Sequence, residues 1–537
     1  YDPKKKPLYL SANDLQYVTR TDEGLAFNDP GLKHQWHYQN KGNYAFVTER
    51  AEAIAGSDVN CVEAWKSCKG DPSIIVAVLD EGVMWSHPDL KANMWTNESE
   101  EIGSTEDKDG NGYKGDRYGY NFVKNTGVIS WTSAEDTGHG THVAGTIAAV
   151  NGNGTGVSGI AGGDGTENSG VKIMTCQLFD GQYGATLAAE AKAIKYAADN
   201  GAVILQCSWG YNSPDANEAL GYVPGPKNEQ DWENQYPLEK EALDYFIHNA
   251  GSPNGVIDGG LAIFASGNEY APSSSFPAGY SKCISVSAIA ADYTPSSYTN
   301  YGTEITLCAP GGDGDYYGTP GTAEDHFDWE TETQGLILST GIKNGQPAYT
   351  YMEGTSMACP HVSGVAALGL SYAVKQRRHF KAAEFKELMI QTANSEFYQE
   401  YDRKVEKLYY YNHATIGASP TLMNLIDRKG KMGKLVDAGA LLKAIGNHGS
   451  DMIVPNVYLA TGKSTSIDLA RYFIDGESLN YSCTVANENI ATTSVDKTIL
   501  TINGIADGST TVTIQAGSKS QTITITVRKN AGGSGWL

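Results

Sequence analysis

The hydrophobic positions between residues 74 and 375 alternate between short apolar runs and longer segments with apolar residues at helical spacing. The short runs are Ile74–Asp80, Val171–Phe179, Ala202–Ser208, Leu261–Ser266 and Cys283–Ile289. They are nearly continuous in apolar residues, which is typical of strands that are buried on both faces. Alanine-rich segments such as Thr186–Asn200 lie between them. This order predicts an α/β domain built on a parallel β-sheet flanked by helices.

The pattern changes from Val454 to Val527, where Thr, Ser, Ile and Val dominate and apolar and polar residues alternate. The strings STTVTIQAG and SQTITITV lie on either side of a Gly-Ser-Lys turn, which predicts a β-hairpin. We expect residues 452–530 to form a separate all-β sandwich after a Gly-rich break near Gly446–Ser450. Residues 531–537, AGGSGWL, are interpreted as a linker or a truncation point.

Length and charge narrow the class of protein. The chain has 537 residues, which is too long for one ordinary domain. Its formal net charge of −22 argues against nucleic acid or an anionic membrane surface as a partner. No apolar run approaches the length of a transmembrane helix. The chain begins with Tyr1 and shows no signal peptide, so we expect an upstream part to have been removed.

The eight cysteines lack both the density of a disulfide scaffold and the spacing of a zinc site. Cys176, Cys207, Cys283 and Cys308 lie in or beside apolar runs. A buried free thiol is the expected state in such surroundings. Cysteine usage therefore does not identify the cellular compartment.

Three residues that can cooperate in nucleophilic catalysis lie at the ends of predicted strands or the starts of predicted helices. Asp80 lies in VAVLDEGV, His139 in DTGHGTHVAGTIAAV, and Ser356 in YMEGTSMACPHVSGVAALGL. A serine nucleophile needs a base that takes its proton and a third group that fixes the tautomer of that base. A serine at a helix N-terminus also lies near free N–H groups and the positive end of the helix dipole. The alternative for Asp80 and Ser356 is a simple capping role.

In these contexts the residues resemble the subtilisin-like serine proteases, or subtilases. The order Asp, His, Ser along the chain is that of subtilisin. The resemblance rests on the blocks DEGVMWSHPDL, GHGTHVAGT, SWG, FASGNEY and GTSMACPHVSGVAAL. It extends over residues 26–447, which it identifies as a peptidase domain. It implies a serine endopeptidase that hydrolyses peptide bonds through an acyl-enzyme.

The resemblance also implies a role for each matched residue. Ser356 would be the nucleophile, His139 the general base and acid, and Asp80 the carboxylate that orients His139. Asn268 would complete an oxyanion hole with the backbone N–H of Ser356. Polypeptide substrates would bind as extended segments and pair with one strand. That strand, which also lines the pocket for the residue before the scissile bond, consists of Ser208, Trp209 and Gly210.

Two positions depart from the family pattern. Glu81 stands where the family often has Ser or Thr, and it places a second carboxylate beside Asp80. We expect Glu81 to point to solvent, because repulsion would otherwise raise the pKa of the pair. Cys359 stands where many relatives have Thr, and we expect it to be buried in packing rather than to confer sensitivity to thiol reagents.

Two regions are candidate calcium sites. The string DKDGNGYKGD places oxygen ligands at Asp107, Asp109 and Asn111 and ends in Asp116. This is the beginning of a calcium-loop pattern, although Tyr118 stands where the pattern has a terminal Glu. The alternative is a solvated turn of Asp, Asn and Gly.

The second candidate is Asp89 with the loop Val150–Val157, which match a calcium site of the family although the loop is one residue longer. Calcium is therefore the expected structural cofactor. Residues 1–25 resemble the tail of a propeptide, which implies a propeptide as folding partner. The acidic segment Tyr211–Leu238 resembles an insertion after the substrate strand. The C-terminal module resembles bacterial Ig-like or cadherin-like repeats.

The resemblance implies a bacterial protein that is secreted or otherwise extracytoplasmic. The rival hypothesis is an adhesion protein built on a catalytically inactive protease domain, and the intact set of Asp80, His139, Ser356 and Asn268 argues against it. An esterase is disfavoured because no GxSxG elbow precedes Ser356. The sequence does not specify which peptide bond is cut.

Overall fold

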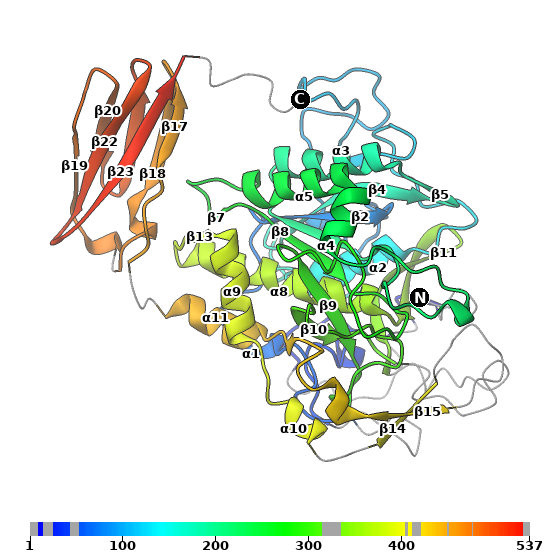
Figure 1. Cartoon of the computed structure of the whole chain (residues 1–537). Coiled ribbons are helices and arrows are strands. Elements are labelled where there is room, and N and C mark those ends of the chain that lie inside the picture. The colour runs from blue at the N-terminus through cyan, green and yellow to red at the C-terminus, as the bar shows by residue number, and fades with distance from the viewer. Residues whose placement is uncertain are drawn as a thin grey trace.

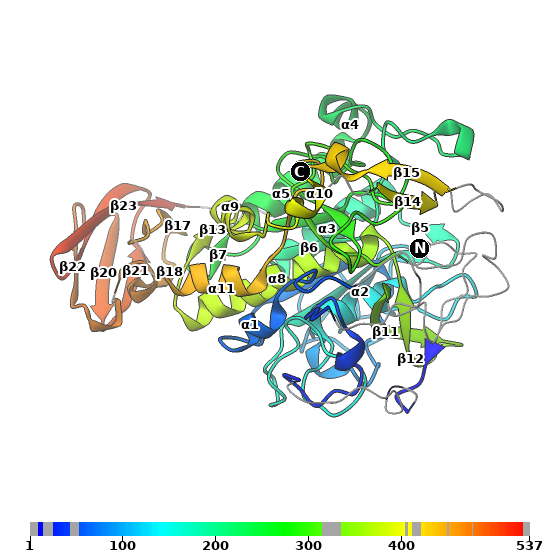
Figure 2. The same ribbon diagram turned by 90° about the horizontal axis from the view of Figure 1, so that it is seen from below.

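The computed structural model describes residues 9–13, 15, 25–42, 53–313, 335–402, 406–410, 420–447, 451–474 and 476–529. It contains an α/β domain followed by a smaller module of two β-sheets (Figures 1 and 2). The α/β part of the predicted fold is confirmed. The predicted break near Gly446–Ser450 falls partly on residues 448–450, and these lie outside the described residues.

A nine-stranded sheet forms the centre of the α/β domain, in the order β16-β10-β9-β8-β6-β2-β4-β3 with β5 beside β4. All pairs along this path are parallel, and only β5 is antiparallel to its neighbour. The strands are β2 (Ile75–Glu81), β3 (Gly119–Asn121), β4 (Lys172–Asp180), β5 (Tyr183–Gly184), β6 (Ile204–Cys207), β8 (Leu261–Ala265), β9 (Ile284–Ile289), β10 (Leu307–Pro310) and β16 (Lys434–Leu435). The five strands predicted from apolar runs are confirmed, each within two residues of its expected ends.

Helices cover both faces of this sheet (Figure 1), and β2 shows why its sequence is apolar throughout. Val76 and Val78 belong to the hydrophobic cluster that contains α2 and α8, whereas Ala77 and Leu79 belong to the cluster that contains α3 and α5. Both faces of the strand are therefore buried. The α-helices are α1 (Cys61–Trp65), α2 (His139–Ala148), α3 (Leu187–Asp199), α4 (Glu229–Gln235), α5 (Pro237–Asn249), α8 (Thr355–Lys375), α9 (Ala382–Thr392), α10 (Tyr398–Tyr401) and α11 (Ala438–Gly446).

Smaller sheets surround the central one. The strands β1 (Tyr9–Leu10), β12 (Gln346–Met352) and β11 (Ile337–Lys343) form one, in which β1 is antiparallel to β12. Two pairs complete the set: β7 (Ile257–Asp258) with β13 (Phe380–Lys381), and β14 (Glu406–Tyr410) with β15 (Pro420–Asn424). Of the predicted propeptide remnant, residues 1–8, 14 and 16–24 lie outside the described residues. Leu15, which is described, is buried against Val157 and Tyr349.

The C-terminal module consists of two sheets around one hydrophobic core. One sheet contains β17 (Val457–Ala460), β23 (Lys519–Arg528), β22 (Gly508–Ala516) and β19 (Tyr481–Val485), and the other contains β18 (Ser464–Asp468), β21 (Ile499–Gly504) and β20 (Ala491–Asp496). Ile467 and Leu500 of the second sheet share the core with Ile514 and Ile525 of the first. The predicted hairpin is confirmed as the antiparallel pair β22–β23. Its resemblance to Ig-like or cadherin-like repeats stays a prediction.

One helix of the described residues, α8, is long and apolar enough to cross a membrane by length and composition. The expectation that no apolar run approaches the length of a transmembrane helix did not anticipate this helix. Most of its apolar window, 89%, is buried inside the domain, so packing in the core accounts for its composition. All eight cysteines are free, and seven of them are buried, which confirms the expectation for Cys176, Cys207, Cys283 and Cys308.

Candidate active site

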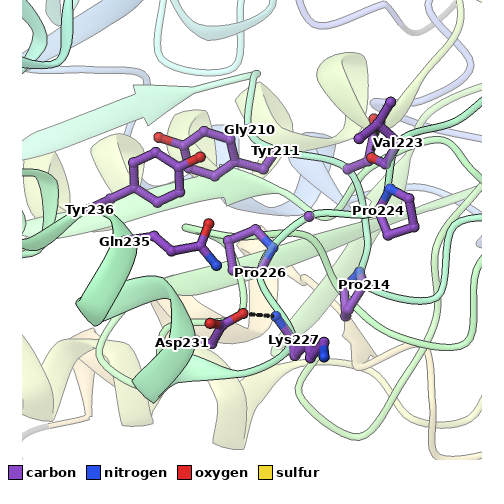
Figure 3. Close-up of a pocket in the computed structure, with 12 residues that line it drawn as sticks. Gly210, Tyr211, Pro214, Val223, Pro224, Pro226, Lys227, Asp231, Gln235 and Tyr236 are labelled. Carbon is purple, nitrogen blue, oxygen red and sulfur yellow. Dashed lines mark hydrogen bonds between the residues drawn. The ribbon is translucent and has the colours of Figure 1, made fainter.

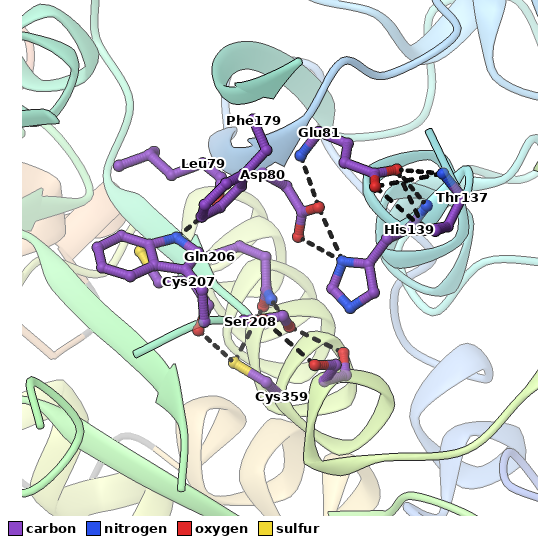
Figure 4. A network of polar contacts seen from close by, with 12 residues as sticks. Leu79, Asp80, Glu81, Thr137, His139, Phe179, Gln206, Cys207, Ser208 and Cys359 are labelled. Carbon is purple, nitrogen blue, oxygen red and sulfur yellow. Dashed lines mark hydrogen bonds and ion pairs between the residues drawn. The ribbon is translucent and has the colours of Figure 1, made fainter. Parts of the chain in front are cut away.

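Asp80 and His139 meet at the carboxyl edge of the central sheet. Asp80 is the penultimate residue of β2 and is 2% exposed, and His139 is the first residue of α2. The Nδ1 atom of His139 lies 2.8 and 2.9 Å from the two carboxylate oxygens of Asp80 (Figure 4). A carboxylate accepts only, so this contact places the proton on Nδ1 and leaves Nε2 as a base. Burial lowers the pKa of His139, but the negative charge and hydrogen bond of Asp80 outweigh it, so this pKa lies above its ordinary value.

Glu81 does not point to solvent, and that expectation was wrong. Its carboxylate accepts hydrogen bonds from the backbone N–H groups of Thr137 and His139 and from the Thr137 hydroxyl, at 3.0–3.3 Å (Figure 4). The N-cap residue of α2 is Gly138, which has no side chain to cap the helix. Glu81 supplies the missing acceptor from the neighbouring strand. Burial raises its pKa, and the charge of His139 opposes that rise.

Ser356, the second residue of α8, is held against the end of β6. Its hydroxyl donates to the carbonyl of Ser208 at 3.2 Å, and its own carbonyl accepts from the Ser208 hydroxyl at 2.8 Å. The second bond has a cause in the sequence: Pro360 lies four residues on and has no N–H to donate to that carbonyl. Among the described residues, Ser356 has no hydrogen bond to His139. Both residues nevertheless lie at the same sheet edge, because β2 and β6 are parallel neighbours and α2 packs against α8.

Asn268 is oriented by Thr355, the residue before Ser356. The backbone N–H and the hydroxyl of Thr355 both donate to the Asn268 side-chain oxygen, at 2.9 and 2.8 Å. A backbone N–H can only donate, so the oxygen faces Thr355 and the amide Nδ2 faces away. Within the described parts of the chain, neither this Nδ2 nor the backbone N–H of Ser356 has a partner. Both donors are thus available for an incoming oxygen.

The strand segment predicted to bind substrate follows β6 directly. Trp209 is half-buried, and its indole donates to the carbonyl of Leu79 at 2.8 Å and contacts Phe264 edge-on. Its side chain therefore supports the segment from the core, whereas Gly210 is exposed. The role of this segment in binding substrate stays a prediction.

Cys359 is buried, as expected. Its sulfur contacts the side-chain oxygen of Gln206 at 3.4 Å and the carbonyls of Cys207 and Ile263 at 3.7 and 3.5 Å. Burial raises the pKa of this thiol to about 12, so it is a neutral thiol at ordinary pH.

The acidic loop that was predicted to bind calcium brings three carboxylates together. One oxygen each from Glu100, Asp107 and Asp109 lie within 4.8 Å of one another. Calcium–oxygen bonds measure about 2.3–2.6 Å, so such a spacing fits three ligands of one Ca²⁺ ion. Asn111 and Asp116 stand beside this cluster and hydrogen-bond to each other at 3.0 Å. Glu100 lies outside the recognised string, which is why the sequence did not reveal it.

Asp89, the second calcium candidate, is fully buried in a set of protein donors. It accepts from the Asn153 amide at 2.7 Å, from the backbone N–H of Val157 at 2.9 Å, and from the Tyr349 hydroxyl. Burial raises its pKa to about 8. Nearby, Asp29 accepts three backbone N–H groups of the same loop. These donors satisfy the oxygens of Asp89 within the protein, and its predicted role as a metal ligand stays a prediction.

Sequence reasoning missed Thr355 and Glu100 as supporting residues of the site, and it noted Glu81 but placed its carboxylate wrongly. Thr355 and Glu81 act through contacts between segments that are distant in the chain, whereas Glu100 lies close to Asp107 but outside the recognised string. Only Pro360 carried a local signal, because a proline inside a helix always leaves one carbonyl without its usual donor.

The model of the subtilase family matches residues 71–409, which is well over half of the chain. Halolysin of Haloferax mediterranei is 30% identical over 69% of this chain and 54% of its own length. The major intracellular serine protease of Bacillus subtilis is 31% identical over 64% of this chain and 83% of its own length. The chain spans about half the length of the first curated relatives that it matches.

Similarity to solved structures agrees with the fold. The serine protease of Aeromonas sobria superposes with a TM-score of 0.52 at 16% identity, over 94% of each chain. That likeness concerns the fold alone, whereas the family match covers the segments that carry Asp80, His139, Asn268 and Ser356. The chain therefore belongs to the subtilase family.

Proposed function

We propose that this protein is a serine endopeptidase that cleaves polypeptides through an acyl-enzyme on Ser356. The observation that carries the proposal is the contact between His139 Nδ1 and Asp80, which leaves Nε2 as a base beside the helix whose second residue is Ser356. The orientation of Asn268 by Thr355 supports it independently, because it leaves two donors for an oxyanion.

The reaction begins when Ser356 exchanges its bond to the Ser208 carbonyl for one to Nε2 of His139. The hydroxyl oxygen then attacks the peptide carbonyl while its proton passes to Nε2. The resulting oxyanion accepts from the Ser356 N–H and from Asn268. Collapse of the intermediate breaks the C–N bond, and His139 returns its proton to the leaving amine. A water molecule, activated by His139, then releases the acyl group from Ser356.

Hydrolysis of casein and of an internally quenched peptide tests the proposal with Ser356→Ala. The matched control is Ser371→Ala, a buried serine of the same helix whose hydroxyl donates to the carbonyl of Ala367. We expect Ser356→Ala to lose activity by about a million-fold and Ser371→Ala to keep it. Equal activity of the Ser356→Ala and wild-type proteins would refute the assignment.

We also propose that calcium binds to Glu100, Asp107 and Asp109 as a structural ion. The spacing of their oxygens supports this proposal. Calcium bound to the folded state raises its stability by mass action. Unfolding should therefore shift to higher temperature when calcium is added to chelator-treated protein. Asp107→Asn should remove most of that shift, and Asp164→Asn, at an exposed aspartate of another loop, should leave it intact.

An extracytoplasmic location is proposed as well. The names of several relatives, such as the extracellular protease of Xanthomonas campestris, support it, although another relative is named intracellular. A propeptide that assists folding and a bacterial source belong to the same proposal. Fractionation of the native cells, followed by detection of the chain in medium, envelope and cytoplasm, tests the location.

A further inference from the structure

The backbone around Asn268 has an unusual shape. Asn268 lies just beyond the end of β8, and its neighbours Gly267 and Tyr270 have φ angles of 104° and 56°. A positive φ is costly for a residue with a large side chain, such as Tyr270, and persists only where surrounding contacts fix it. The bonds from Thr355 orient the side chain of Asn268 and not the backbone that carries it. The position of this backbone therefore depends on other contacts.

Asn300, in the loop between β9 and β10, supplies those contacts. It is completely buried, and its side-chain oxygen accepts from the backbone N–H groups of Glu269 and Ala271 at 3.1 and 2.9 Å. Its side-chain nitrogen donates to the carbonyl of Ser266 at 2.9 Å and to the carboxylate of Glu269. Its backbone N–H donates to the carbonyl of Gly267 at 3.0 Å. One residue thus binds the chain on both sides of the proposed oxyanion donor.

The orientation of the Asn300 amide follows from these partners. A backbone N–H only donates and a carbonyl only accepts, so the oxygen faces Glu269 and Ala271 and the nitrogen faces Ser266. Both lone pairs of the oxygen and both hydrogens of the nitrogen are then used. A side chain on Gly267 would collide with the Asn300 nitrogen, so this close approach requires glycine.

The loop that carries Asn300 also reaches the start of α8. The hydroxyl of Tyr298 accepts from the backbone N–H of Gly354, the N-cap residue of α8, at 2.9 Å. The backbone carbonyl of Tyr298 accepts from the N–H of Tyr270 at 2.9 Å. The loop therefore connects the two segments that carry the proposed oxyanion donors.

A weaker contact to the same segment comes from the insertion Tyr211–Leu238. Part of the insertion lines a pocket, whose walls include Tyr211 and Pro214 (Figure 3). The backbone N–H of Ser213, between these two residues, donates to the carboxylate of Glu269 at 3.4 Å. This bond reaches a side chain and is long, whereas the bonds from Asn300 reach the backbone itself. Asn300 is therefore the stronger support of the segment.

We propose that Asn300 is a positioning residue of the oxyanion hole, which fixes the backbone of Asn268 while Thr355 fixes its side chain. The inference rests on the proposed peptidase function and goes beyond it, because it names the residue that keeps this donor in place. An oxyanion donor acts at about 2.7–3.1 Å from the developing charge. A backbone shift of about 1 Å takes the Asn268 amide out of that range.

A double-mutant cycle on kcat tests this role. Asn300→Ala should lower kcat by about ten- to a hundred-fold with little change in KM on one quenched peptide, because a donor that acts in the transition state is displaced. In the Asn268→Ala background the same change should lower kcat by less than about three-fold, since the donor that it positions is already absent. Equal fold losses in the two backgrounds would overturn the proposal.

Asn300→Asp provides a second variant if Asn300→Ala does not fold. Its oxygens can still accept from Glu269 and Ala271, but an ionised carboxylate cannot donate to the carbonyl of Ser266 and repels the carboxylate of Glu269. We expect the same lack of additivity with Asn268→Ala. Additive losses would count against the proposal here as well.

Asn93→Ala is the matched control. Asn93 is also buried, and its side-chain nitrogen donates to the carbonyls of Ala148 and Gly162 at 2.9 and 3.0 Å. The change therefore removes comparable hydrogen bonds at the C-terminal end of α2. We expect kcat to stay within about two-fold of the wild-type value. A loss as large as that of Asn300→Ala would mean that general loosening explains both, and would overturn the proposal.

Hydrogen exchange separates this inference from the proposed function. It is measured on Ser356→Ala protein with and without Asn300→Ala, so that self-digestion is excluded. The backbone amides of Glu269 and Ala271 lose their acceptor and should exchange at least about ten-fold faster, while the rest of the α/β domain keeps its rates. That result supports the positioning role even if the wild type cleaves nothing. Unchanged exchange in residues 266–271, or faster exchange throughout the domain, would overturn it.

Discussion

The two ends of α8 hold different kinds of contact. At its first turn, Thr355 and Ser356 are buried and bonded to Asn268 and Ser208. Beyond its last turn, Arg377 is half exposed and forms ion pairs with Asp468 and Glu477 of the C-terminal module. A helix of 21 residues separates these ends by about 30 Å.

The first turn of α8 depends on its contacts more strongly than the last turn does. Buried hydrogen bonds at the first turn cost about 1–3 kcal/mol when one partner is removed, whereas exposed ion pairs contribute about 0–1 kcal/mol. The module is also held by Tyr472, whose hydroxyl donates to the carbonyl of Pro253 at 2.7 Å, and by a bond between Asn254 and Thr465. It therefore docks at the end of α8 far from the nucleophile and leaves the first turn to the chemistry.

Among the variants at the two ends of α8, Asn268→Ala should have the largest effect on peptide hydrolysis. The change removes one of the two oxyanion donors while leaving Asp80, His139 and Ser356 in place. We expect kcat to fall by about a hundred- to a thousand-fold with little change in KM. Steady-state kinetics on one quenched peptide measures both constants. A rise in KM at constant kcat would instead assign Asn268 to ground-state binding.

Ser208→Ala should destabilise the first turn by about 1–3 kcal/mol, because it leaves the buried Ser356 carbonyl without a donor. Pro360→Ala restores a helical N–H four residues from that carbonyl. We therefore expect the double variant to recover part of the loss that Ser208→Ala shows alone. Denaturant unfolding of the two single variants and the double variant gives the coupling energy. Strict additivity would contradict the proposed link between Pro360 and Ser208.

Glu81→Gln should shift the pH dependence of catalysis. His139 must be neutral to act as a base, so kcat/KM rises as pH increases through the pKa of His139, which lies above its ordinary value. The negative charge of Glu81 helps to raise that pKa. Its removal should move the rising limb to lower pH, while the glutamine oxygen still accepts from the start of α2. An unchanged limb would show that Asp80 alone sets the pKa.

Arg377→Ala should have the smallest effect. It removes the exposed ion pairs to Asp468 and Glu477 but keeps the bond from Tyr472 to Pro253. We expect a loss of stability of about 1 kcal/mol or less and an unchanged rate of peptide hydrolysis. Differential scanning calorimetry and the quenched-peptide assay measure the two quantities. A marked fall in hydrolysis would mean that the far end of α8 influences the first turn.

The sequence predicted the elements whose cause is local. Continuous apolar runs predicted the parallel strands, because burial on both faces leaves no polar positions in a strand such as β2. Asp80, His139 and Ser356 were recognised from their blocks, and the structure places Asp80 and His139 in direct contact.

What escaped prediction depends on neighbours that are distant in the chain. From the sequence, the Glu81 carboxylate could point to solvent or bind another part of the chain. The free N–H groups at the start of α2, which it binds, come within its reach only because β2 lies beside that helix. Thr355 fixes Asn268 across 87 residues of chain. Likewise, the docking of the C-terminal module rests on Arg377 and Tyr472. The hydrophobic pattern of the sequence does not indicate the partners of these two residues.

The most direct test of the central claim is labelling with a fluorophosphonate probe, followed by mass mapping of the modified peptide. The serine oxygen displaces fluoride from the phosphorus of the probe, and this phosphonylation requires a base and an oxyanion hole assembled around that serine. We expect wild-type protein to be labelled at Ser356 alone, Ser356→Ala protein to remain unlabelled, and Ser371→Ala protein to be labelled like the wild type. Labelling at another serine, or none in folded wild-type protein, would contradict the assignment of Asp80, His139 and Ser356 as one catalytic unit.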